Sequence, residues 1–258
     1  MNTSSRGKQQ QGNALWFILV AIVLLGALTV LVSRSGTDVN QSGDFERRQI
    51  MASQLLRYAK GIEETVRSMQ ARGISESDIS FENTVIAGYA HTPAEPDDHQ
   101  VFGGGGGQTY NVPNLEWLDK KQSANAGYRE WLFTGKLGVA NNSSSTAPRD
   151  TSLVMILPYI SRDMCIALNR MMRHDGYDSD TPVEDDTSVL GDIAVLDKYN
   201  GEATDYVLAA RIDGAGTSYP VLPVDLNYWK GKHAGCARGS DAGGGAPRYV
   251  FFQTLIVR

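Results

Sequence analysis

The sequence predicts an α+β fold in which a long N-terminal helix, apolar in its first half and amphipathic in its second, packs against an antiparallel β-sheet. Three observations predict it. Residues 14–32 carry no charge, and residues 44–72 repeat apolar side chains at helical spacing. Several later runs are short and rich in β-branched and aromatic residues, which is typical of strands.

The apolar run predicts a membrane-spanning helix over residues 13–34. The run covers residues 14–32, which are 19 uncharged residues, and it begins with Ala14, Leu15, Trp16 and Phe17. At 1.5 Å per residue such a run spans close to 30 Å, about the thickness of a bilayer core. A cleaved secretory signal has a shorter apolar region followed by a small-x-small site, so we expect this helix to be retained.

The next segment predicts a hinge followed by an amphipathic helix, together residues 35–72. Residues 34–43 (RSGTDVNQSG) are polar and contain glycine and serine, as loops do. Asp44 then offers an N-cap and Gly73 a C-cap for the helix. One face of that helix carries an apolar stripe of Leu55, Ala59, Ile62, Val66 and Met69.

The rest of the chain, residues 73–258, is expected to form one globular domain. Strands are predicted over residues 128–133, 137–140, 152–157, 205–212 and 249–257. Pro158 is expected to end the third of them. Ser161 is expected to cap a short helix that runs to Arg173.

The composition and the motif content limit which partners and which enzymatic activities are expected. The net charge is −5, and no basic stretch interleaved with aromatics occurs, so nucleic acid is not an expected partner. No GxSxG, HExxH or paired-carboxylate signature is present, and the four histidines are scattered, so we expect no enzymatic activity. The two cysteines permit one pairing: a disulfide in an oxidising compartment, or two free thiols in the cytosol.

Three polar or glycine-rich segments contain residue types that occur in ligand sites. Five glycines at 103–107 lack the Lys-Ser/Thr that a phosphate loop requires, so a flexible surface loop is expected. The loop that contains His91, Glu95, Asp97, Asp98 and His99 has metal-ligand chemistry but no helical spacing, so a solvated loop is expected. The acidic cluster that contains Asp175, Asp178 and Asp180 is a weak calcium candidate without EF-hand spacing. No cofactor is expected otherwise.

The residues before the apolar run resemble the class III signal of prepilins. Residues 6–13 read RGKQQQGN: a short basic, polar leader that ends in Gly12, directly before the apolar helix. The resemblance implies that a prepilin peptidase cuts after Gly12 and leaves Asn13 as the mature N-terminus, often methylated in this family. It also implies that the leader, residues 1–12, is cytoplasmic and that the globular domain is periplasmic or on a surface filament.

The first 85 residues resemble, more narrowly, a group of little-characterised pilin-like proteins of proteobacteria. The resemblance lies in GNALWFILVAIVLLGALTVLVSRSG, ASQLLRYAKGIEETVRSM and GISESDISFEN. It implies a subunit of a type IV pilus or type II secretion system in the bacterial inner membrane. Its partners would be other pilin-like subunits and the assembly machine. It also implies an oxidising compartment, so we expect a disulfide between Cys165 and Cys236, as pilins commonly staple their C-terminal part.

One position departs from the family. Major pilins carry Glu at the fifth mature position, where it pairs with a neighbour's N-terminus. Here that position is Phe17. A carboxylate at membrane depth is costly and normally functional, so its absence indicates a minor or tip-located subunit. The alternative is a single-pass, membrane-anchored periplasmic binding protein or adhesin that does not polymerise.

Overall fold

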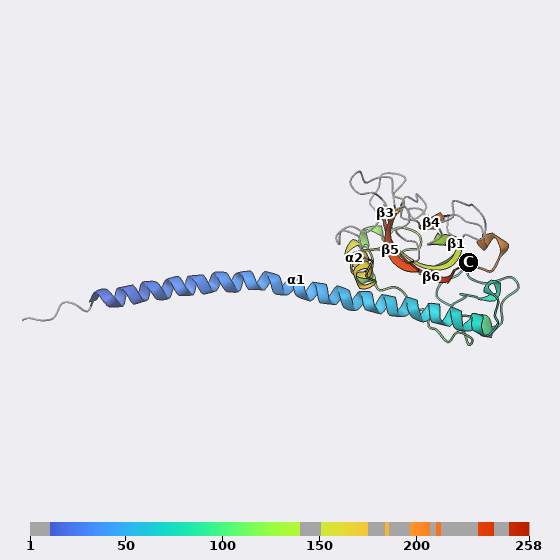
Figure 1. The fold of residues 1–258 in the computed structure, drawn as a ribbon, viewed down its shortest axis with the longest axis horizontal. Helices are drawn as coiled ribbons and strands as arrows, with labels where there is room; N and C mark the ends of the chain where they lie inside the picture. The colour runs from blue at the N-terminus through green and yellow to red at the C-terminus, as the bar shows by residue number, and fades with distance from the viewer. Residues whose placement is uncertain are drawn as a thin grey trace, which may run out of the picture. The chain divides into compact units, whose positions relative to one another are not determined.

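The computed structural model describes seven stretches of the chain: residues 11–139, 151–174, 184–185, 197–206, 210–212, 232–239 and 248–257. The chain divides into two compact units, Met1–Arg47 and Arg48–Arg258. Figure 1 colours the described parts from blue at the N-terminus to red at the C-terminus.

The N-terminal helix, α1, extends over Gln11–Ala71 and includes the segment predicted to be a hinge. The predicted break at residues 34–43 is therefore wrong at the level of the backbone, and Asp44 lies inside the helix instead of capping it. The physical reason is that this segment contains no proline. Each glycine costs a helix only about 1 kcal/mol, and extending a helix needs no new nucleus.

The second half of α1 buries the predicted stripe and ends where expected. All five stripe residues, and Ala52 before them, have no exposed surface. Gly73 has a φ of +91°, which a residue with a Cβ adopts only at a cost. Ile74 N–H donates to Met69 O at 3.2 Å, and Gly73 N–H donates to Gln70 O at 2.9 Å. These two bonds satisfy carbonyls that the helix end would otherwise leave unpaired.

The globular unit is built on a mixed six-stranded sheet in the order β3-β5-β6-β2-β1-β4. The strands are β1 (Leu132–Val139), β2 (Ser152–Ile160), β3 (Glu184–Asp185), β4 (Ala210–Ile212), β5 (Ala234–Gly239) and β6 (Arg248–Val257). The four central strands pair antiparallel, whereas the short edge strands β3 and β4 pair parallel to their neighbours. The predicted α+β class, a helix on an antiparallel sheet, is confirmed.

Several strands differ from their prediction: β1 joins the predicted strands at 128–133 and 137–140, and β3 and β5 were not predicted. Two further differences have a local geometric cause. β2 continues past Pro158, where the pairing with β6 shifts between Leu157 and Ile160. A proline at such a bulge removes no ladder hydrogen bond, and Tyr159 takes up the bend with a φ of 58°. In the described residues of the predicted strand at 205–212, a 3-10 turn (Ala203–Tyr206) occupies the start and β4 the end.

The central sheet is buried on both faces. On one face Leu153, Met155 and Leu157 join the apolar cluster that contains the α1 stripe. On the opposite face Val154 and Ile156 are also fully buried. Alternating side chains of β2 therefore all lie inside the domain, which explains why this strand reads as a continuous apolar run.

Candidate functional site

The first half of α1 presents large apolar side chains that the chain itself leaves uncovered. Ten of them are between 56% and 67% exposed: Trp16, Phe17, Ile18, Leu19, Ile22, Val23, Leu24, Leu25, Leu28 and Val30. The Thr29 hydroxyl donates to Leu25 O at 2.6 Å, so the polar side chain of this stretch is satisfied within the helix. The segment is therefore suited to apolar surroundings on every side.

The predicted processing residues lie in the first turns of this helix. Gly12 and Asn13 belong to α1, as do Ala14 and Leu15, but the side chains described begin at Trp16. Among the residues whose side chains the structure describes, no helix is long and apolar enough to be a candidate membrane span. The predicted span, residues 13–34, begins before and ends after that set of side chains, which covers residues 16–30.

A buried carboxylate ties the second half of α1 to the last strand. The Glu63 side chain is 3% exposed and accepts from Lys60 at 2.9 Å and Arg67 at 2.6 Å. Gln253 of β6 donates to the same carboxylate at 2.9 Å. Three donors compensate the loss of hydration, so this group has a structural role.

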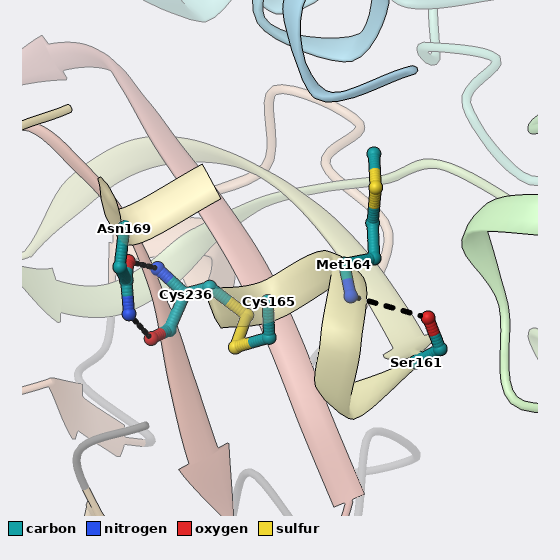
Figure 2. The surroundings of a disulfide bond; sticks show 5 residues. All are labelled: Ser161, Met164, Cys165, Asn169 and Cys236. Carbon is teal, nitrogen blue, oxygen red and sulfur yellow. Dashed lines mark hydrogen bonds between the residues drawn. A yellow bond between two sulfur atoms is a disulfide. The ribbon is translucent and has the colours of Figure 1, made fainter. Parts of the chain in front are cut away.

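The two cysteines are bonded to each other, as predicted. Cys165 lies on α2 (Arg162–Met171) and Cys236 on β5, with Cα atoms 5.3 Å apart. Neither residue has exposed surface. The predicted cap of α2 is also confirmed, since Ser161 Oγ accepts from Met164 N–H at 3.4 Å (Figure 2).

Side chains of and after α2 occupy the outer edge of β5. Asn169 Nδ2 donates to Cys236 O at 2.8 Å, and Cys236 N–H donates to Asn169 Oδ1 at 2.9 Å. The side-chain amide thus pairs with the backbone of Cys236 as the peptide group of a further strand would (Figure 2). Beyond it, His174 Nε2 lies 2.8 Å from Ala234 O.

Tyrosines satisfy the backbone at the start of β1 in a similar way. Tyr89 Oη donates to Trp131 O at 3.0 Å and accepts from Phe133 N–H at 3.1 Å. Tyr110 Oη accepts from Trp131 N–H at 3.0 Å, and Tyr199 N–H donates to Phe133 O at 2.9 Å. Desolvation by burial raises the pKa of the Tyr89 and Tyr110 phenols, which keeps both hydroxyl groups protonated.

The histidine-containing loop is less solvated than predicted. His91 is only 6% exposed, and its ring meets that of Tyr199 edge-on. Glu95 lies between two imidazoles, 2.7 Å from His99 Nδ1 and 3.7 Å from His91 Nδ1. Among the described residues, however, no group of three or more His, Cys, Asp or Glu side chains could hold a metal ion. The weak calcium candidates Asp175, Asp178 and Asp180 lie outside the described residues.

The five-glycine run forms a tightly packed loop, which sequence reasoning missed. Gly105 N–H donates to Asp97 O at 3.0 Å, and Gly106 N–H donates to Gln100 O at 2.9 Å. A Cβ at Gly105 would overlap the carbonyl of Asp98. The glycines therefore permit close backbone approach, and these amides are not free to bind an anion. The signal in the sequence that could have indicated this packing is the run of consecutive glycines outside a phosphate-loop motif.

Comparisons of the chain with protein-family models, with curated proteins and with solved structures give no match. The geometry alone establishes an N-terminal helix followed by a four-stranded antiparallel sheet with a disulfide. Two features go beyond the packing of the core: the exposed apolar side chains in the first half of α1 and the edge of β5 that α2 covers. The first bears on function and the second on self-association.

Proposed function

We propose that this chain is a pilin-like or pseudopilin-like subunit of a type IV pilus or type II secretion system, in a minor or tip position. The observation that carries the proposal is that one helix has two environments. Its second half is part of the globular core, whereas residues 16–30 expose apolar side chains throughout. In the pilin-like proteins that the first 85 residues resemble, such a helix serves as a membrane anchor and, after assembly, as the packing element of a filament.

The exposed half of α1 supports a role in assembly on energetic grounds. Burying a large apolar side chain stabilises by about 1.5–3 kcal/mol, and ten such side chains are exposed here. Lipid tails and the helices of neighbouring subunits both supply apolar surroundings. A subunit can therefore move between bilayer and filament without exposing this surface to water.

The opposite face of α1's second half limits where such contacts form. Between residues 51 and 70 its exposed positions are polar or charged, among them Gln54, Arg57, Lys60, Glu64 and Arg67, whereas Phe45 and Ile50 before them are exposed apolar side chains. Helix packing between subunits would thus be concentrated before residue 51, chiefly in residues 16–30. The proposed sequence of events is cleavage after Gly12, retention of α1 in the inner membrane, and docking of the apolar half against neighbouring helices.

Phe17 bears on the position of the subunit. Its ring is 65% exposed and meets Trp16 edge-on, with centroids 6.0 Å apart. A phenyl ring has no charge to offer the N-terminus of an adjacent subunit. The same residue favours the second candidate, a single-pass anchored periplasmic binding protein or adhesin that does not polymerise.

Cysteine crosslinking in membranes separates the two candidates. Both native cysteines are bonded to each other, so one new cysteine on α1 reports its own neighbours. We expect Val23→Cys to form crosslinked products with other subunits under mild oxidation. Gln54→Cys, on the polar face, is the matched control and should give none. A membrane-bound protein without crosslinks at Val23 or at positions one to three residues on either side would support the non-polymerising anchor.

A further inference from the structure

The outer edge of β5 is able to accept a strand. β3 pairs there in parallel, with Glu184 opposite Arg238 and Asp185 opposite Gly239. Among the residues that the structure describes, this pairing covers the C-terminal end of β5. Edges of this kind present unpaired N–H and C=O groups and are templates for strands of other chains.

Next to the residues that pair with β3, a side chain of α2 bonds to the same edge of β5. In an antiparallel ladder the backbone groups of alternate residues face away from the partner strand. In β5 these are the groups of Cys236 and Ala234, because they bond to Asn169 and His174 instead of β6. Side chains thus satisfy the carbonyls of both residues and the N–H of Cys236.

The cover is held by a covalent bond at its centre. Asn169 lies one turn after Cys165 on α2, and its hydrogen-bond partner is Cys236 itself. The disulfide therefore fixes α2 at the residue whose backbone the amide blocks (Figure 2). Without this bond α2 would be held by the hydrogen bonds and by the core packing of Met164, Ala167 and Leu168, and it would open on the edge more often.

We infer that α2 is a disulfide-locked cover over the β5 edge, and that it prevents a second copy of this chain from adding a strand there. A dithiol unlocks it: the S–S bond takes up two electrons and two protons to give two thiols, while the dithiol closes into a disulfide. Release of α2 then exposes the outward groups of Ala234 and Cys236. A second copy is the partner because its own uncovered β5 offers the same short, edge-competent strand.

The test uses the full-length protein in detergent micelles, with and without a dithiol. Sedimentation velocity reports self-association, and amide hydrogen exchange at Cys236 reports the state of the edge. With the dithiol, and more strongly in Asn169→Leu, we expect exchange at Cys236 to accelerate on the order of tenfold and dimers to form. Asn125→Leu, which loses a side-chain amide bond to Gln122 remote from this edge, should match the wild type.

A proline identifies strand pairing as the cause. The N–H of Ala234 faces the same side as that of Cys236, so Ala234→Pro removes a donor on the outer edge only. It should abolish the dimers of the reduced protein; dimers that persist would overturn the inference.

Unchanged exchange and unchanged oligomeric state in the folded, reduced protein would overturn it as well. If reduction unfolds the domain, the oxidised Asn169→Leu variant is the test. Full protection of the Cys236 amide from exchange in that variant would contradict the role of α2 as a cover. All variants share α1, so the result is independent of assembly through that helix.

Discussion

Gln253 of β6 donates a hydrogen bond of 2.9 Å to the carboxylate of Glu63 on α1. The two residues are 190 positions apart in the sequence, and both are buried. The bond connects the second half of the helix to a strand at the centre of the sheet. Any displacement of α1 from the sheet would leave the Gln253 amide without this partner.

We therefore expect Glu63→Ala to destabilise the globular unit by about 1–3 kcal/mol, the cost of leaving a buried polar group unsatisfied. Glu64→Ala, at the exposed neighbouring position, is the control and should change stability by less than about 0.5 kcal/mol. Chemical denaturation of the two variants measures the difference. Equal midpoints would contradict a structural role for Glu63.

A buried aspartate predicts a pH dependence. Desolvation raises the pKa of Asp205 above its ordinary value of 3.8, although N–H groups of Asn200 and Glu202 bond to the carboxylate. The folded state thus holds this proton more tightly than the unfolded chain, so its contribution to stability is present below about pH 3.8 and is lost as pH rises through the raised pKa.

We expect Asp205→Asn, which keeps an accepting oxygen but carries no charge, to gain stability relative to the wild type between pH 3.5 and pH 7. Unfolding free energies at the two pH values test this. Glu202→Gln, an exposed neighbour, should show no such gain. A wild type that gains on the variant with rising pH would reverse the sign and reject the assignment.

The five-glycine loop predicts a position-specific sensitivity to a methyl group. At Gly105 a Cβ meets backbone of Asp98, whereas at Gly104 it meets the movable carboxylate end of Asp97. Gly105→Ala should cost about 1–3 kcal/mol, as overpacking does, and Gly104→Ala less. Thermal unfolding of both variants provides the comparison, and a larger loss at Gly104 would argue against this loop geometry.

Processing is predicted to depend on Gly12. In cells with an active prepilin peptidase, the wild-type protein should begin at Asn13. Gly12→Leu should retain the leader, because a bulky side chain precedes the cleavage point, whereas Gly7→Leu in the same leader should be cut normally. Intact mass and N-terminal sequencing measure both. A wild-type protein that keeps its leader would exclude prepilin-type maturation.

Features governed by short-range rules were predictable from the sequence. The apolar stripe of α1 follows helical spacing, Gly73 supplies the positive φ of the helix end, and Ser161 caps α2. The pairing of Cys165 with Cys236 followed from the number of cysteines and the compartment that the resemblance implies. None of these requires knowledge of distant contacts.

Features that depend on distant backbone were not predictable. Pro158 lies within β2 because β6, almost a hundred residues later, accommodates a bulge. The glycine loop is compact because it folds against residues 97–101, and His91 is buried beneath Gly201. Asn169 gave no signal at all, since an amide on a short helix is common and its partner lies on β5.

The position of β6 has a consequence for the order of events during synthesis. It is the last described strand along the chain, yet it lies inside the sheet, between β5 and β2. The central sheet therefore cannot form until residues 248–257 have left the ribosome. Until then, an emerging chain with this topology lacks the strand that joins β5 to β2, and the apolar faces of those two strands remain without their shared neighbour.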